Sequence, residues 1–424
     1  MTVKRRVVLV LLAYFVFFMI SFLTNILNPL SPDIKSTFDL SDALVGLIPF
    51  AFFIAYGPMS IPAGMLLEKY GEKSVFICSF FLAFLGSLLF GTFPTYPVYI
   101  ISLFIIGSGI AMLQVVNNPL LRSAGGEKLF AFFSVVGQLV FSSAAVFGPQ
   151  IYKYIVTNIN TTSSNAFLDL LSSLVKSNPS WTALYWIFAV GTLFAIGVIA
   201  ITKFPKVELQ EDERAGTKDT YVELLKNKFV YLFFIGIFAY VGTEQGVGYW
   251  ISSFMQRYHE WDPETQGANL VSRFWGFLTI GCVFSLLLLA LFDCRKILVG
   301  FVSGALVCLT LGLIGSEKTA FWAFPMVGFF LSIMWSAVFS LGMNSVPKHH
   351  GSLSGILCTG IIGGAFVPFI IGGLSGLFGD LKMGMIFLYV TLGYLLLIGF
   401  WAKPIVENAT FLDRWREKRK LKEA

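Results

Sequence analysis

Charged residues are scarce in this chain, because Lys, Arg, Asp and Glu together make up only 13% of its 424 residues. Soluble globular proteins carry about 25%. Hydrophobic residues make up 56% of the chain. A soluble fold would have to bury roughly a dozen apolar runs of about 20 residues, and single cores stop growing near about 250 to 300 residues. The composition therefore excludes a soluble globular protein and predicts a polytopic membrane protein.

Histidine and cysteine are also rare. The three histidines, His259, His349 and His350, lie in predicted loops and form no catalytic or metal-binding pattern. The five cysteines show no C-x-x-C spacing, so no disulfide framework or metal site is expected. The segment from Gly71 to Ser74 lacks the glycine spacing of a phosphate-binding loop. We therefore expect no enzyme and no cofactor, and the dispersed basic residues indicate no nucleic acid partner.

Long apolar segments fill most of the chain, and a helix of about 20 residues crosses the hydrocarbon core of a bilayer. We expect an all-α membrane protein with 12 transmembrane helices. The predicted spans are residues 6–30, 43–67, 74–93, 97–121, 129–156, 181–202, 229–256, 268–292, 296–315, 319–345, 351–377 and 383–403.

The loops between these spans are charged asymmetrically. Of the 30 Lys and Arg residues, 23 fall on one side of the predicted membrane and six on the other. By the positive-inside rule, both termini lie in the cytoplasm of a multi-pass protein of the cell (inner or plasma) membrane. The longest charged stretch follows the sixth span and separates two halves. The predicted units are an N-terminal six-helix half (1–202), a cytoplasmic linker (203–228), a C-terminal six-helix half (229–403) and a basic tail attracted to anionic lipid (404–424).

Three carboxamides stand inside the fourth predicted span. Gln114, Asn117 and Asn118 follow i, i+3 and i+4, which places them on one face of a helix. Amides in hydrocarbon need hydrogen-bond partners, so this face should point to other helices or to a water-filled cavity. We favour the cavity, which indicates a path for a solute.

Other polar residues form stripes at helical spacing in the first, fifth and tenth spans. Small hydroxyl side chains also allow close helix packing, and for the serines we favour packing over a cavity. The stripes are Ser21, Thr24, Asn25 and Asn28; Ser134, Gln138 and Ser142; and Ser332, Ser336, Ser340 and Asn344.

Six plus six spans joined by a charged linker resemble the major facilitator superfamily, in which two halves rock around a site at mid-membrane. The loop after the second span supports the resemblance, because Gly64, Glu68, Lys69, Gly71 and Lys73 are similar to the superfamily's glycine, acid and base signature. The resemblance implies a major facilitator fold and a loop whose charges latch the halves in one state. An ordinary charged turn is the alternative.

Four motifs narrow the resemblance. They are TNILNPLSP (24–32), LQVVNNP (113–119), YVGTEQGVGYW (240–250) and SIMWSAVFSL (332–341). Together they resemble the fucose/proton symporter family, which includes glucose/galactose and N-acetylglucosamine permeases. This implies a monomeric secondary active transporter that takes up a hexose or amino sugar, coupled to H⁺ or Na⁺. A uniporter or an exporter of another small polar solute is the alternative, and a sugar receptor is disfavoured because no loop is large enough for a signalling domain.

The chain departs from that family at two positions. Fucose members carry an Asp in the first span and a Glu in the fourth, where this chain has Asn28 and Gln114, and amides carry no coupling proton. The remaining intramembrane charges are Glu244 and Arg273. They form either a structural ion pair or a coupling or gating site, and an unpaired Glu244 could take over the proton.

A sugar site needs donors and acceptors for hydroxyl groups and an aromatic face for the C–H surface. The coupling or gating candidates are Glu244, Arg273, Glu68, Lys69 and Lys73. The candidate substrate residues are Asn28, Gln114, Asn118, Gln138, Glu244, Gln245 and Asn344 for hydrogen bonds, and Trp275 and Trp335 for the aromatic face.

Overall fold

A computed structural model of the chain describes residues 3–125, 130–159, 166–175, 178–202, 204, 218–346 and 350–402. All regular structure in these ranges is helical, as predicted. The first half contains α1 (Val3–Asn25), α2 (Leu27–Phe38), α3 (Asp42–Phe53), α4 (Tyr56–Thr92), α5 (Tyr96–Gly125), α6 (Phe130–Asn158), α7 (Ala166–Val175), η2 (Ser180–Thr182) and α8 (Ala183–Ile201).

The second half begins after a short helix, α9 (Lys218–Leu225), in the predicted linker. Most of that linker and all of the predicted tail (404–424) lie outside the described residues. The second half contains α10 (Lys228–His259), η3 (Pro263–Gly267), α11 (Ala268–Leu291), α12 (Cys294–Ile314), α13 (Glu317–Leu331), α14 (Met334–Asn344), α15 (His350–Thr359), η4 (Gly360–Ile362), α16 (Gly363–Phe378), α17 (Leu381–Met385) and α18 (Phe387–Trp401).

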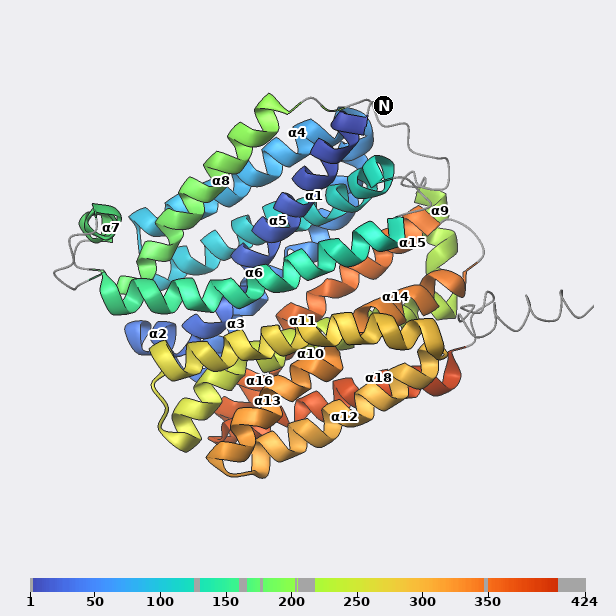
Figure 1. Ribbon diagram of the computed structural model, residues 1–424. Coiled ribbons are helices and arrows are strands. Elements are labelled where there is room, and N and C mark those ends of the chain that lie inside the picture. Colours follow the sequence, from blue (N-terminus) through green and yellow to red (C-terminus); the bar gives the residue numbers. More distant parts are fainter. Residues whose placement is uncertain are drawn as a thin grey trace, which may run out of the picture.

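Eleven of the described helical segments are long and apolar enough to cross a membrane. The 29-residue α6 occupies the remaining predicted span. The two halves form two bundles that lie against each other, one containing α1, α4, α5, α6 and α8 and the other α10 to α18 (Figure 1). We call the membrane side on which α1 begins the N-terminal side, and the other the opposite side, where α2 and α7 lie.

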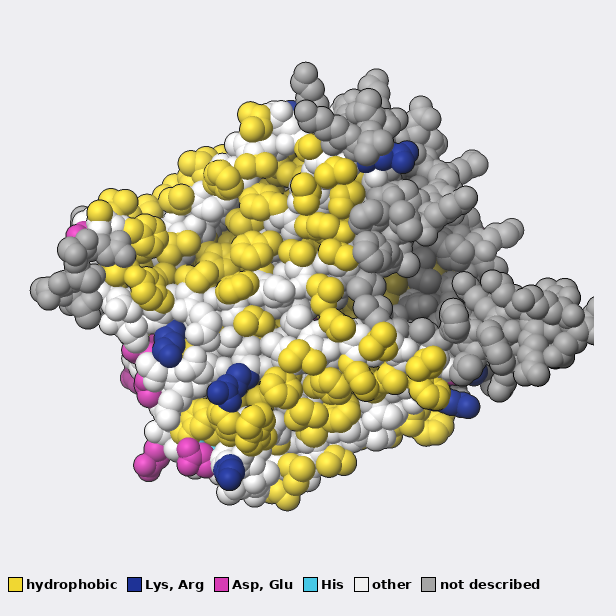
Figure 2. All heavy atoms as spheres, viewed as in Figure 1, with side chains coloured by type: hydrophobic (Ala, Val, Ile, Leu, Met, Phe, Trp, Pro, Cys, Tyr) yellow, Lys and Arg dark blue, Asp and Glu magenta, His cyan; other side chains and the backbone are white. Residues whose placement is uncertain are grey.

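Apolar side chains cover the outer faces of the bundles. Figure 2 shows hydrophobic groups over the middle of this surface and Asp and Glu side chains gathered at its left margin, on the opposite side. Val190, Phe194, Val307 and Leu397 are among the exposed hydrophobic residues. Helices satisfy their own backbone hydrogen bonds, so such a surface is stable in lipid but not in water.

Several predicted spans are interrupted. The first breaks at Ile26, between α1 and α2, and the tenth at Ser332 and Ile333, between α13 and α14. The backbone at all three residues keeps right-handed helical dihedral angles, so these breaks are local turns within the spans and not unwound segments. Polar residues flank the turn in each half, and backbone groups freed by a turn at membrane depth must find partners in the protein or in water.

The halves are joined in the middle and on the opposite side. Ser31 and Ser253 share a hydrogen bond of 2.9 Å, and the Tyr249 hydroxyl donates to the carbonyl oxygen of Val45 at 2.9 Å. Next to them α3 and α16 touch through glycine: a Cβ on Gly372 would lie 2.4 Å from the Asp42 carbonyl oxygen. The opposite side is therefore closed.

Candidate substrate and coupling site

A chain of hydrogen bonds crosses between the halves beside the break at Ile26. The Gln245 amide on α10 donates to the Asn25 side chain on α1 and to the Glu244 carboxylate, both at 3.4 Å. The Tyr240 hydroxyl donates to the other Glu244 oxygen at 2.5 Å. All four side chains are buried. A carboxylate and two amides from both halves therefore meet at one place.

Glu244 has no basic partner among the described residues. Arg273 does not reach it, because its side chain is exposed and its guanidinium lies 4.3 Å from the centre of the Phe321 ring. The ion pair considered from the sequence does not form. A buried carboxylate without a counter-charge is costly, and that cost falls when it binds a proton or a cation.

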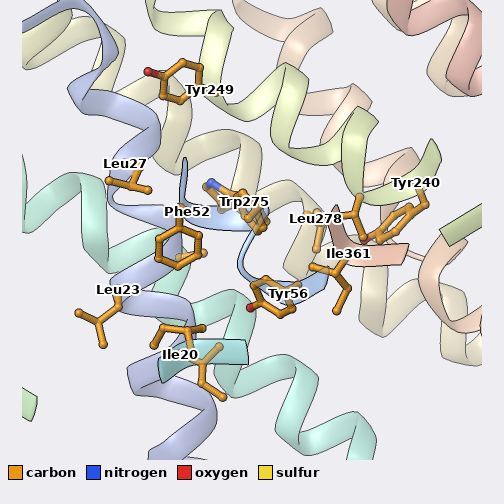
Figure 3. Packing of buried hydrophobic residues seen from close by; sticks show 14 of the residues in the cluster. Ile20, Leu23, Leu27, Phe52, Tyr56, Tyr240, Tyr249, Trp275, Leu278 and Ile361 are labelled. Carbon is orange, nitrogen blue, oxygen red and sulfur yellow. The ribbon is translucent and has the colours of Figure 1, made fainter. Parts of the chain in front are cut away.

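Two aromatic candidates lie inside the molecule, and one of them contacts the Tyr240 ring. Trp335, which is half-buried, packs against Tyr240 with a distance of 6.1 Å between ring centres. Trp275 is buried, and its indole N–H has no partner in the described part of the chain. Figure 3 shows Trp275 projecting into a packed interior that also contains Tyr240, Leu278 and Phe52, so residues from both halves build it.

The three amides of α5 do not share one role. Asn117 is buried and donates to the Ala13 carbonyl oxygen on α1 at 3.1 Å, so it joins two helices and does not face a cavity. Gln114 on α5 and Gln138 on α6 are half-buried and have no hydrogen bond to another described residue. They remain available to a ligand. The side chains of the candidates Asn28, Asn118 and Asn344 lie outside the described part.

In the stripe of the first span, the hydroxyl groups act in helix packing, whereas the buried hydroxyls of Ser142 and Ser332 have no hydrogen-bond partner among the described residues. Ser21 donates to the Phe141 carbonyl oxygen at 2.5 Å and joins α1 to α6. Thr24 donates to the Ile20 carbonyl oxygen in its own helix at 2.8 Å. Hydroxyl groups bound to backbone in this way let helices approach closely.

Comparison with known proteins identifies the family. The Major Facilitator Superfamily profile matches residues 11–361. The chain belongs to the major facilitator superfamily. It is 31% identical over 372 residues to a glucose/galactose transporter of Brucella abortus, which covers 86% of each chain. It is 27% identical over 393 residues to the L-fucose-proton symporter of Escherichia coli, again with 86% of each covered.

The same fold occurs in a solved structure. The crystal structure of the E. coli fucose:proton symporter superposes with a TM-score of 0.68 at 22% identity, covering 93% of this chain and 98% of that one. The predicted major facilitator fold and the resemblance to the fucose/proton symporter family are confirmed, and these relatives are transporters, not enzymes.

The signature loop of the superfamily bends α4 at Gly71, whose φ of 73° suits glycine because it has no Cβ. The Lys73 ammonium donates to the carbonyl oxygens of Ala200 and Thr202 at 2.6 and 3.2 Å. These residues end α8 in the same half, so in this conformation Lys73 does not contact the other half. The side chains of Glu68 and Lys69 lie outside the described part.

A second polar cluster lies on the opposite side, and the sequence did not predict it. Asp42 at the start of α3 binds Lys35, Arg257 and Ser375. Each of these residues stands near the end of an apolar span, where a charge or hydroxyl usually faces solvent. No sequence signal joins them, because Arg257 and Ser375 are 215 and 333 positions from Asp42.

A third acidic group, Asp33 of α2, lies close to this cluster in the chain. The Tyr152 hydroxyl of α6 donates to it at 2.6 Å. Burial raises the pKa of Asp33 to about 6; the hydrogen bond from Tyr152 lowers the pKa, and the charges of Glu264 and Asp262 raise it. Since those two belong to the second half, Asp33 faces like charges across the interface.

Proposed function

We propose that this protein is a secondary active transporter that takes up a hexose or an amino sugar by alternating access, coupled to H⁺ or Na⁺. Relatives named glucose/galactose transporter and L-fucose-proton symporter, each matched over 86% of this chain, support the substrate class. The excess of Lys and Arg on the N-terminal side assigns that side to the cytoplasm. The described conformation is then closed to the outside.

One observation carries the coupling proposal: a buried carboxylate, Glu244, with no cation beside it and bonded through Gln245 to Asn25 in the other half. A proton or Na⁺ there removes the cost of the buried charge. The same amide contact joins the halves, so binding at Glu244 and the rocking of the halves affect each other. Gln114, Gln138, Trp275 and Trp335 would contact the sugar, with Asn28, Asn118 and Asn344 as further candidates.

A facilitated uniporter is the second candidate, and it is favoured by the amides at positions 28 and 114. Neither side chain titrates, so coupling depends on Glu244 alone.

Transport in proteoliposomes tests the proposal. Labelled glucose, galactose, fucose and N-acetylglucosamine are offered first in counterflow without a gradient and then with an imposed proton or sodium gradient. We expect counterflow of at least one sugar and accumulation with one of the two gradients. Counterflow without accumulation under either gradient would establish the uniporter. Absence of exchange for all four sugars would overturn the substrate assignment.

A further inference from the structure

The Asp42 carboxylate lies at the contact between the halves on the opposite side. One Nη of Arg257 lies 2.9 Å from both of its oxygens, and the Ser375 hydroxyl donates to it at 2.5 Å. The Lys35 ammonium also donates to it. The Asp42 side chain is only 8% exposed, whereas those of Lys35 and Arg257 are 36% and 31% exposed.

These partners come from different halves. Lys35 on α2 belongs to the same half as Asp42, whereas Arg257 on α10 and Ser375 on α16 belong to the other. If the halves separate on this side, Asp42 loses Arg257 and Ser375 and retains Lys35. The carboxylate is then still paired.

Arg257 also has an acidic neighbour in its own half. Asp380 follows α16 and accepts a hydrogen bond from Tyr258, the residue after Arg257. This hydrogen bond holds the pKa of Asp380 below its usual value, and the charges of Lys382 and Arg257 lower it further. The hydrogen bond from Tyr258 therefore places the Asp380 carboxylate beside the residue that follows Arg257, on the same half.

We propose that Asp42 and Arg257 form an exchangeable gate: they bind each other while the opposite side is closed, and when it opens Asp42 keeps Lys35 as its one cation and Arg257 binds Asp380. The inference rests on the alternating access of the proposed function, and it concerns the regulation of access to the same central site. The inference does not depend on which sugar is transported.

The partner exchange makes the gate reversible. Removing one member of a buried ion pair leaves an uncompensated charge, and this is strongly destabilising. With Lys35 and Asp380 in place, neither charge is left alone in either state. The adjacent glycine contact between α3 and α16 keeps the closed interface tight, because Gly46 and Gly372 let the two backbones meet. The gate thus has two paired states and no unpaired one.

Thiol labelling measures opening without a substrate. Ser253, buried against Ser31 between the halves, is replaced in a Ser253→Cys variant, and the protein is reconstituted in liposomes. A membrane-impermeant maleimide is added on the opposite side, and mass mapping follows the introduced thiol separately from the native cysteines. Slow labelling is expected in this background. Arg257→Gln should raise its rate about tenfold, which corresponds to about 1.4 kcal/mol.

A second substitution distinguishes a gate from a general loss of stability, because the two predict opposite changes in the labelling rate. Lys35→Met removes a partner that Asp42 needs most in the open state, so labelling should become about threefold slower. A substitution that merely damaged the fold would make it faster. Asp39→Asn is the matched control, because Asp39 is a nearby residue outside the cluster and Asn tolerates its positive φ of 50°; its rate should equal that of the background.

A double-substitution cycle tests the pairing itself. The combination of Asp42→Asn and Arg257→Gln should label no faster than Arg257→Gln alone, because the two substitutions remove the same Asp42–Arg257 interaction. Additive rates, an unchanged rate in Arg257→Gln, or faster labelling in Lys35→Met would each overturn the gate. A failure to find any transported sugar would not affect these rates, so the two proposals fail independently.

Discussion

Two carboxylates in this protein, Asp42 and Glu244, are both nearly inaccessible to solvent but have different hydrogen-bond partners. Counted over the whole residue, Asp42 is 7% exposed and Glu244 is 8% exposed. Asp42 is held by an arginine, a lysine and a serine, whereas the hydrogen bonds to Glu244 come from a phenol and an amide. A carboxylate with two cations is stable only as an anion and holds helices together. A carboxylate bound by neutral donors can gain a proton or a cation and lose it again.

Glu244→Gln should have the largest effect on transport, because it removes the carboxylate that can gain and lose a proton or a cation. The amide keeps the shape and one acceptor but does not titrate. Gradient-driven sugar accumulation should fall at least about tenfold, a change of about 1.4 kcal/mol or more, while counterflow without a gradient persists. The measurement is uptake in proteoliposomes with and without the gradient. Asp169→Asn, on the exposed face of α7, serves as the control and should accumulate normally. Accumulation by the Glu244 variant would exclude Glu244 as the coupling group.

Tyr240→Phe should have an intermediate effect, because it removes a hydrogen bond to the anionic form of Glu244. If the coupling ion is H⁺, the pH at which accumulation is half-maximal should move upward by about one unit, equivalent to about 1.4 kcal/mol. Maximal counterflow should change little, since the ring still packs against Trp335. Phe and Tyr have similar volumes. The matched control is Tyr249→Phe, because it also loses one hydrogen bond, to Val45 of the other half. A midpoint that moves downward or not at all would contradict this role.

The sequence predicted the spans and Glu244 because hydropathy is a local property and a charge inside an apolar helix stands out. It could not predict the Asp42 cluster, because Arg257 and Ser375 become neighbours of Asp42 only when the halves dock. Asn117 shows a second limit. Its spacing from Gln114 correctly put both residues on one side of a helix. That side nevertheless has two different environments, because Asn117 contacts α1 whereas Gln114 is half-buried and has no such contact. Helical spacing predicts which residues of a helix point in the same direction, but it does not predict which part of the protein they face.

Asp33→Asn should have the smallest effect, and it tests whether the interface around Asp42 also contains a repulsive group. Since the pKa of Asp33 is raised to about 6 from 3.8, the described state binds its proton more tightly than an open, hydrated state does. The closed interface should therefore gain stability as pH falls through about 6, and lose it as Asp33 ionises against Glu264 and Asp262. A shift from 3.8 to about 6 would slow labelling of the Ser253→Cys thiol by up to about tenfold between pH 7 and pH 5. Because Asp33 is partly exposed and its charge is screened by solvent, we expect about threefold. Each rate is divided by the rate at which the same maleimide reacts with free cysteine at the same pH, to cancel the pH dependence of the maleimide reaction. Asp33→Asn should abolish this slowing; if the slowing remained, the proton would bind elsewhere, and the contrast between a paired Asp42 and a repelled Asp33 would be lost.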